Sequence, residues 1–289
     1  MGEKDITEKA LADYNDVFAD IMNVLAFNGK DIIKAKGLAN SRDISRYKID
    51  GKMHELERDV TKLYSRNEVR LALVGVEHQT QVDKDEPFRV IGYDGAAYRS
   101  QLLKNSRERY PVVTIVLYFG LSRWNSSKSL YEALDIDEEW KPFVNDYKIN
   151  LFEIAYLEPE QVQMFKSDFR IVADYFVQMR MNKEYMPSKE TIKHVDELFK
   201  LMAVLTGDAR FEERQNMDCG KEVTTVCELF DIYENRGIEK GKIEGKIEGK
   251  IEGKIELLLE MGYESEEMSR MIGISVEEVE RIVEDIKAC

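Results

Sequence analysis

The sequence is poor in the residues that build disulfide frameworks, zinc sites and long linkers. It holds 3 cysteines, 3 histidines and 5 prolines in 289 residues. The cysteines form no CxxC pair, so neither a disulfide framework nor a zinc site is predicted, and reduced cysteines are expected. The longest strongly apolar run, residues 112–119, is too short to span a bilayer, and the charged start MGEKDITEKA lacks the apolar core of a signal peptide. We therefore expect a soluble, cytoplasmic protein with no membrane partner.

Charge is distributed unevenly along the chain. The net charge of −14 argues at first against a nucleic-acid partner, because phosphate contacts need Lys and Arg. Residues 30–130, however, hold 19 Lys and Arg against 13 Asp and Glu, a net charge of +6, so the rest of the chain carries −20. This asymmetry permits DNA binding by the first half without proving it.

Apolar spacing predicts a mixed α/β segment in the first 160 residues. Residues 6–27 and 87–102 have helical spacing, and Asp50-Gly51 between two β-rich stretches predicts a hairpin. The predicted strands cover residues 47–50, 52–64, 71–76, 111–119 and 150–157. The order of helix, three strands, helix and strand predicts a mixed sheet flanked by helices.

The rest of the chain predicts helices. A helical extension covers residues 161–235, a Gly-Lys-Ile-Glu repeat of period four covers residues 236–256, and a small helical tail with a Ser275–Glu278 capping box covers residues 257–289. The repeat has two interpretations. Lys, Ile and Glu with Glu–Lys neighbours favour a helix, whereas the cost of about 1 kcal/mol per glycine favours a flexible charged linker. We favour the helix, which needs a packing partner, so self-association through residues 236–289 is expected.

Two acidic residues carry the main chemical signal. Glu77 and Gln79 lie two apart at the end of a predicted strand, so their side chains leave the same face. Asp59 lies in the preceding strand, and pairing of the two strands would bring Asp59 and Glu77 together. Two carboxylates with room for water are typical of Mg²⁺ sites, and such a metal activates water for attack on a phosphate. The structural alternative is that both acids form ion pairs with basic residues nearby, such as Arg58, Lys62 or Arg89.

Three stretches carry a family resemblance: ERDVTKLY at residues 57–64, GVEHQTQVD at residues 75–83 and PFRVIGYDGAAYR at residues 87–99. They resemble the Rpn family of recombination-promoting nucleases, also called PD-(D/E)XK nuclease family transposases, over about residues 10–160. The resemblance implies a PD-(D/E)XK nuclease-like core in residues 1–160 with a restriction-endonuclease-like sheet. It also implies a DNA endonuclease that depends on Mg²⁺ or Mn²⁺.

The resemblance also assigns roles to single residues. Asp59 and Glu77 match the metal-binding acids, and Gln79 stands where the wider superfamily has lysine, which puts the turnover rate and activity itself in doubt. Asp16 matches an acidic position on the first helix and is a candidate third metal ligand; the alternative is an exposed helix acid. The candidate DNA contacts are Arg99, Lys62 and Arg89, with ion pairing to an acid as the alternative for Arg99.

Two classes of function follow from these observations. The first is Mg²⁺-dependent hydrolysis of DNA in recombination, transposition or defence. The second is a catalytically weak or inactive nuclease fold that binds nucleic acid or protein and self-assembles through its C-terminal helices. In a weaker third hypothesis, the acidic tail occupies the basic cleft until assembly removes it.

Overall fold

The computed structural model describes residues 10–40, 45–49, 52–56, 60–64, 69–76, 83–103, 109–212, 214 and 223–288. The chain divides into two compact units, Met1–Leu229 and Phe230–Cys289. Within the described ranges, no helix combines the length and the apolar character needed to cross a membrane.

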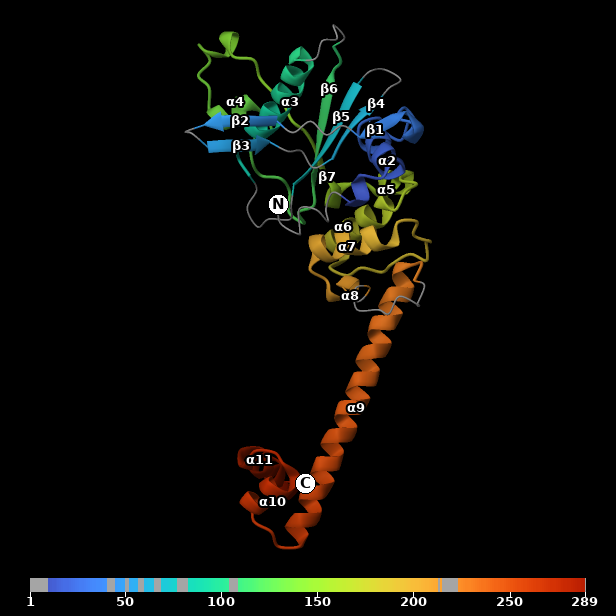
Figure 1. Cartoon of the computed structure of the whole chain (residues 1–289), viewed down its shortest axis with the longest axis vertical. Helices are drawn as coiled ribbons and strands as arrows, with labels where there is room; N and C mark the ends of the chain where they lie inside the picture. Colours follow the sequence, from blue (N-terminus) through green and yellow to red (C-terminus); the bar gives the residue numbers. More distant parts are fainter. Residues whose placement is uncertain are drawn as a thin grey trace. The chain divides into compact units, whose positions relative to one another are not determined.

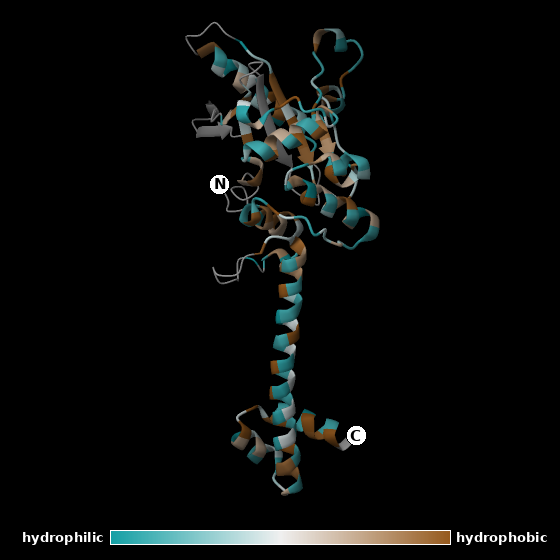
Figure 2. Ribbon diagram, turned by 90° about the vertical axis from the view of Figure 1, so that its right-hand side faces the viewer, coloured by the Kyte–Doolittle hydropathy of each residue, from teal (hydrophilic) through white to brown (hydrophobic). Residues whose placement is uncertain are grey.

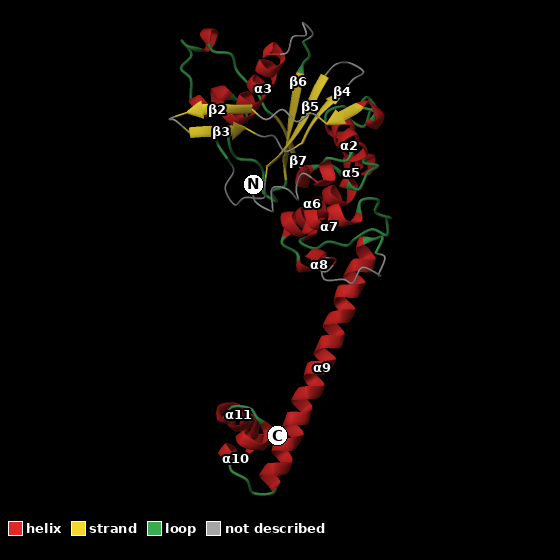
Figure 3. Ribbon diagram, in the orientation of Figure 1, coloured by secondary structure: helices red, strands yellow, loops and turns green. Residues whose placement is uncertain are grey.

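A five-stranded mixed sheet forms the centre of the first unit (Figures 1 and 3). Its strands, in spatial order, are β1 (Leu38–Asn40), β4 (Val60–Tyr64), β5 (Val69–Val76), β6 (Val112–Tyr118) and β7 (Asn150–Glu153). Strands β1, β4 and β5 pair antiparallel, whereas β5, β6 and β7 pair parallel. Strand β5 therefore lies in the middle of the sheet, which confirms the prediction of a central strand at residues 71–76.

Helices cover both faces of this sheet. They are α2 (Asn15–Leu25) and α3 (Glu86–Leu103). Lys62 of β4 lies over the ring of Phe18 in α2, while Val116 of β6 packs against α3. Lys62 pairs with Leu71, and Val116 pairs with Val74, three residues further along β5. Because side chains alternate along a strand, α2 and α3 lie on opposite faces.

The first predicted helix is interrupted in the structure. Residues 10–12 are helical, Tyr14 has an extended backbone, and α2 begins only at Asn15. The ammonium of Lys62 donates a hydrogen bond of 2.5 Å to the main-chain oxygen of Asp13. That oxygen is an acceptor which a continuous helix would use for itself. The prediction of one helix over residues 6–27 was therefore wrong at this point.

The predicted returning strand is also divided. β2 (Ser45–Ile49) and β3 (Lys52–Leu56) pair antiparallel with Ile49 opposite Lys52, which agrees with the predicted hairpin, although the turn residues Asp50 and Gly51 lie outside the described residues. However, this pair makes a separate two-stranded sheet, and residues 60–64 belong to the large sheet as β4. The last predicted strand is likewise shorter, because β7 ends at Glu153 and a 3-10 turn, η3 (Ile154–Tyr156), follows it.

Helices complete the first unit. They are α4 (Leu130–Leu134), α5 (Pro159–Met164), α6 (Phe169–Asn182), α7 (Val195–Thr206) and α8 (Ala209–Glu212), with further 3-10 turns η1 (Ala35–Gly37) and η2 (Lys141–Phe143). The aromatic core of this part is centred on Phe176 of α6, whose ring lies 5.3 Å from that of Phe119. The first unit is thus a mixed α/β fold with a helical extension, as predicted.

The C-terminal unit is helical. Its helices are α9 (Val226–Glu260), which begins in the first unit, α10 (Ser265–Ile272) and α11 (Val276–Ala288). Helix α9 is continuous through the Gly-Lys-Ile-Glu repeat, which confirms a helix there rather than a linker. The predicted capping contact is present too, because Ser275 accepts a hydrogen bond of 3.2 Å from the backbone of Glu278.

Candidate active site

The sheet topology brings four strand ends to one edge. The parallel strands β5, β6 and β7 end together, with Val76 opposite Tyr118 and Tyr118 opposite Glu153. Strand β4 runs the other way and begins at Val60, which pairs with Leu73 of β5. The chain therefore enters β4 and leaves β5 at the same edge of the sheet.

The three predicted catalytic residues adjoin this edge in sequence. Asp59 directly precedes Val60, and Glu77 and Gln79 follow Val76. All three lie outside the described residues, so their predicted convergence on a metal stays a prediction. The end of β5 at Val76 was predicted from the strand pattern, whereas the start of β4 at Val60 was not, because the predicted strand ran through residues 52–64.

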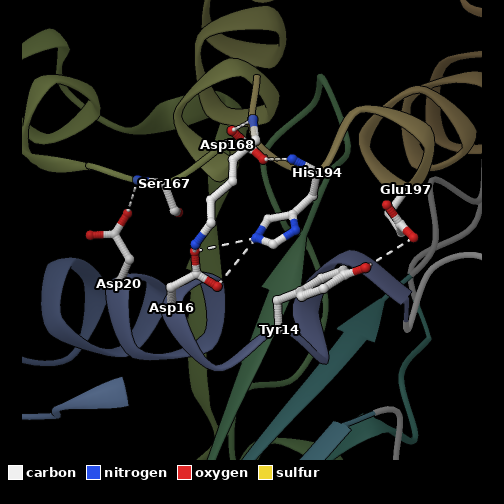
Figure 4. A network of polar contacts seen from close by, with 8 residues as sticks. Tyr14, Asp16, Asp20, Ser167, Asp168, His194 and Glu197 are labelled. Atoms are coloured by element: carbon white, nitrogen blue, oxygen red, sulfur yellow. Dashed lines mark hydrogen bonds and ion pairs between the residues drawn. The ribbon is translucent and has the colours of Figure 1, made fainter. Parts of the chain in front are cut away.

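Asp16, the predicted third metal ligand, lies at the start of α2 and faces the helical extension (Figure 4). The ammonium of Lys193 donates a hydrogen bond of 2.6 Å to one carboxylate oxygen. The ring nitrogen Nε2 of His194 lies 3.2 Å from both oxygens. In this structure Asp16 therefore ties α2 to the segment that precedes α7.

Neighbouring residues strengthen the same junction. Asp168 accepts backbone hydrogen bonds from Lys193 and His194, at 3.0 and 2.7 Å. Asp20 accepts two more from the backbone of residues 166 and 167. The ring of Tyr14 stacks on the ring of His194 with 3.6 Å between centroids, and its hydroxyl donates to Glu197 (Figure 4). The sequence offered no signal for this network, because its contacts from Tyr14, Asp16 and Asp20 reach residues more than 140 positions away.

The network alters the protonation of its members. Partial burial acts to raise the pKa of Asp16, but hydrogen bonds from Lys193 and His194 outweigh it and hold the pKa below its usual value. The hydrogen bond to Asp16 raises the pKa of Lys193. The hydrogen bond to Glu197 is the main cause that raises the pKa of Tyr14. Asp16 is thus a paired anion at neutral pH, and a metal at this carboxylate would compete with Lys193.

A pocket of about 270 Å³ lies beside this junction, between α2 and the loops around residues 29–35 and 164–167. Asp16, Asp20 and Asp31 contribute to its wall, but each already has a cationic or N–H partner. Throughout the described ranges, no group of three His, Cys, Asp or Glu side chains could hold a metal ion.

Lys62, a predicted DNA contact, is fully buried. Its ammonium donates hydrogen bonds to the main-chain oxygen of Asp13 at 2.5 Å, to the carboxylate of Asp13 at 3.0 Å and to the side chain of Asn40 at 2.5 Å. It therefore joins β4 to β1 and to the residues before α2. The geometry gives Lys62 a structural role, and its contact with DNA stays a prediction without support.

The two predicted arginine contacts lie on α3 and differ in their surroundings. Arg89 forms an ion pair of 2.9 Å with Asp83 and lies 3.5 Å from the buried carboxylate of Glu86. Its charge is therefore largely matched within the protein. Arg99 has an exposed side chain further along the helix. Of these two arginines, Arg99 is the better placed to meet a phosphate.

A further arginine, which the sequence analysis did not single out, lies at the edge where β6 and β7 end. Arg123 is 63% exposed and forms an ion pair of 3.0 Å with Glu153, the last residue of β7. Its guanidinium also stacks 3.8 Å from the ring centroid of Tyr156. Arg123 is more exposed than Arg89, so its guanidinium has edges open to a phosphate although one nitrogen pairs with Glu153. Its position directly after a predicted central strand was the available signal.

A comparison with known families gives one match. The model of a family described as "Putative transposase, YhgA-like" matches residues 62–209. The match covers more than half of the chain and confirms the family resemblance carried by the sequence motifs. It begins just after Asp59 and includes Glu77 and Gln79. No curated protein and no solved structure matches the chain.

Proposed function

Because the chain belongs to the YhgA-like transposase family, we propose that it is a metal-dependent DNA endonuclease with a restriction-endonuclease-like core. Asp59, Glu77 and Gln79 form its centre. The observation that carries the proposal is the antiparallel pairing of β4 and β5, because it brings Val60 and Val76, the described neighbours of these residues, to one edge.

The residue types suit this chemistry. A divalent cation, Mg²⁺ or Mn²⁺, held by Asp59 and Glu77 would lower the pKa of a bound water and offset the charge that develops on the phosphate. Gln79 orients the attacking water through its amide. It carries no positive charge, unlike the lysine of the wider superfamily, so turnover is slow. Arg99 and Arg123 contact DNA phosphates.

The geometry of β4 and β5 bears on whether the two acids can share a site. Val60 lies opposite Leu73, so regular alternation beyond these strands would put Asp59 and Glu77 on opposite faces of the sheet. Asp59 and Glu77 lie beyond the ends of these strands and outside the described residues, so a shared site does not follow from strand alternation. The variants of the nicking assay test it instead.

Plasmid nicking tests the proposal directly. Supercoiled DNA is incubated with the full chain and Mg²⁺ or Mn²⁺, and the wild type is compared with Asp59→Asn and Glu77→Gln. Each change removes one charged ligand while it preserves side-chain shape. We expect each variant to nick about 100-fold more slowly or worse.

The matched control is Asp85→Asn, an acid-to-amide change at an exposed residue just before α3. It should nick at the wild-type rate. Nicking that survives both Asp59→Asn and Glu77→Gln would remove the proposed centre. Fluorescence melting of each variant separates loss of chemistry from loss of folding.

A second candidate function is favoured by Gln79 itself. Without a lysine at this position, the fold could bind DNA without cutting it. The variant Gln79→Lys separates the two candidates, because it supplies the missing cation. Wild-type nicking supports the enzyme. No nicking by the wild type together with nicking by Gln79→Lys supports a binding protein derived from a nuclease.

A further inference from the structure

The second unit has a small core of its own. The last turns of α9 pack against α10 and α11, and the fully packed residues are Ile255, Met268, Val279 and Val283. Ile251 packs at the margin of the same core. The C-terminal end of the isoleucine row of the repeat therefore lies in the hydrophobic core of the second unit.

Towards the N-terminus the same row becomes exposed. Ile247 and Ile243 are 53% and 55% exposed, whereas Ile255 is completely buried. Figure 2 shows short hydrophobic stretches, in brown, separated by hydrophilic ones along the middle of α9. The glycines from Gly237 to Gly253 each have open space where a side chain would begin. This part of α9 therefore presents an uncovered apolar row.

The period of four arranges the charges in rows as well. Residues four apart form a ridge inclined by about −26° to the helix axis. Successive residues are rotated by about 100° around the helix axis. A lysine precedes each isoleucine and a glutamate follows it, so the lysines lie on one side of the isoleucine ridge and the glutamates on the other. One flank is lined by lysines 242, 246 and 250, and the other by glutamates 244, 248 and 252.

This arrangement is unfavourable within one helix. Each lysine has a lysine four residues away, and each glutamate has a glutamate, and like charges at this spacing repel. Lys240 and Glu244 form an ion pair at this spacing, but Lys240 precedes the first complete Gly-Lys-Ile-Glu unit. The Glu–Lys support expected from the sequence therefore fails inside the repeat. A partner that sets opposite charges against both flanks would relieve the repulsion.

We propose that the partner is a second copy of this chain, whose α9 packs parallel to the first with the isoleucine ridges face to face. A two-fold axis along a parallel pair sets the lysine flank of each copy against the glutamate flank of the other. An antiparallel pair would set lysine against lysine and glutamate against glutamate. Ridges of this type pack against each other in the commonest class of helix pairs, and an isologous contact closes as a dimer.

This inference does not depend on nuclease activity, and a charge-exchanged chain tests it. In this variant Lys242, Lys246 and Lys250 become Glu, while Glu244, Glu248 and Glu252 become Lys. Composition, net charge and the isoleucine row stay unchanged. Wild type and variant, distinguished by a mass tag, are mixed at about 50 µM, well above a micromolar Kd, and the species are counted by native mass spectrometry.

In a parallel pair, wild type associates with wild type and variant with variant. A mixed dimer is disfavoured because lysine would face lysine on one flank and glutamate would face glutamate on the other. We therefore expect two kinds of homodimer and few mixed ones. A predominance of mixed dimers would instead reveal antiparallel packing and overturn the proposed direction. A wild type that stays monomeric at this concentration would overturn the interface itself.

The contribution of the isoleucine side chains to dimerisation is tested by a second pair of variants. The double variant Ile243→Ser/Ile247→Ser should weaken dimerisation at least about tenfold, because both side chains leave the proposed seam. Leu257→Ser changes a residue of α9 with similar exposure, 57%, that lies outside the isoleucine row. It should leave dimerisation unchanged. Equal effects of the two changes would place the contact elsewhere.

Discussion

Among single residues, Asp16 makes a contribution to stability that depends on pH. Its pKa is lowered in the folded chain, so its stabilising effect is present above about pH 4 and is lost as the pH falls through the folded pKa. The pKa of Lys193 is raised, so its effect is present below about pH 10 and is lost as the pH rises further. The pair therefore acts across the neutral range.

The variant Asp16→Asn tests this window. At pH 7 it should lower the melting temperature by up to about 3 °C, because the pair is partly exposed and screened by solvent. As the pH falls through the lowered pKa of Asp16, the difference from wild type should disappear. In a Lys193→Met background the same change should cost less, because the partner is already gone. A deficit that persists unchanged through this fall in pH would speak against the pairing.

Gly120 is required for a steric reason. A Cβ at this position would lie closer to the hydroxyl and ring of Tyr118 than real Cβ contacts allow. Tyr118 is 3% exposed and meets the ring of Trp124 edge-on at 5.2 Å, so it has no room to move. Gly120→Ala should therefore lower the free energy of unfolding by about 1–3 kcal/mol.

Urea unfolding followed by tryptophan fluorescence measures this loss. Gly92→Ala provides a control of opposite sign, because Gly92 lies inside α3 with open space around it. That change should raise the free energy of unfolding by about 0.5–1 kcal/mol. An increase in the free energy of unfolding for Gly120→Ala, as for Gly92→Ala, would contradict the close approach of Tyr118 to residue 120.

At the scale of elements, Lys62 joins three segments that are distant in sequence. The variant Lys62→Met keeps the buried stem and removes the ammonium that Asp13 and Asn40 share. It should lower the free energy of unfolding by at least about 2 kcal/mol, since three hydrogen bonds are lost and each bond to a charged group is worth about 1.5–3 kcal/mol. Hydrogen exchange in β1 should accelerate, because β1 loses the side-chain hydrogen bond between Lys62 and Asn40 that supports its pairing with β4.

DNA binding separates this structural role from a phosphate contact. In a Glu77→Gln background, which blocks cutting, Lys62→Met should leave the salt dependence of DNA affinity unchanged. Arg123→Gln should reduce the slope of log K against log salt by about 0.9, the value for one phosphate. A reduced slope for Lys62→Met would restore Lys62 as a DNA contact.

Elements with a strong local signal were predictable from the sequence. Pro87 and the apolar residues after it located α3, and the β-branched run at residues 111–119 located β6. The break before α2 was not predictable, because Lys62, 49 residues away, takes the backbone oxygen of Asp13. The end of β5 at Val76 was likewise predictable from its apolar run. The start of β4 at Val60 fell inside the predicted strand 52–64, and the ion pair of Asp16 with Lys193 joins residues 177 positions apart, so neither was predicted.

At the scale of the whole molecule, the two units differ in their means of stability. The first unit has a sheet covered by helices and a large aromatic core. The second has one small apolar cluster and a helix that carries five glycines, each of which costs about 1 kcal/mol relative to alanine. The second unit should therefore unfold first, and its stability should depend most on association with another copy.

The positions of the tryptophans make this division measurable. Trp124 and Trp140, the 2 tryptophans of the chain, both belong to the first unit, so their fluorescence reports on that unit alone. Far-UV circular dichroism reports on both units, because α9, α10 and α11 contribute strongly to it. On heating, the dichroism signal should begin to fall at a lower temperature than the fluorescence signal changes.

Raising the protein concentration should raise the temperature of the early dichroism transition and leave the temperature of the fluorescence transition unchanged. Only the second unit dimerises through α9, so only its stability depends on concentration. The double variant Ile243→Ser/Ile247→Ser should abolish this concentration dependence, and coincident transitions at all concentrations would contradict the separation.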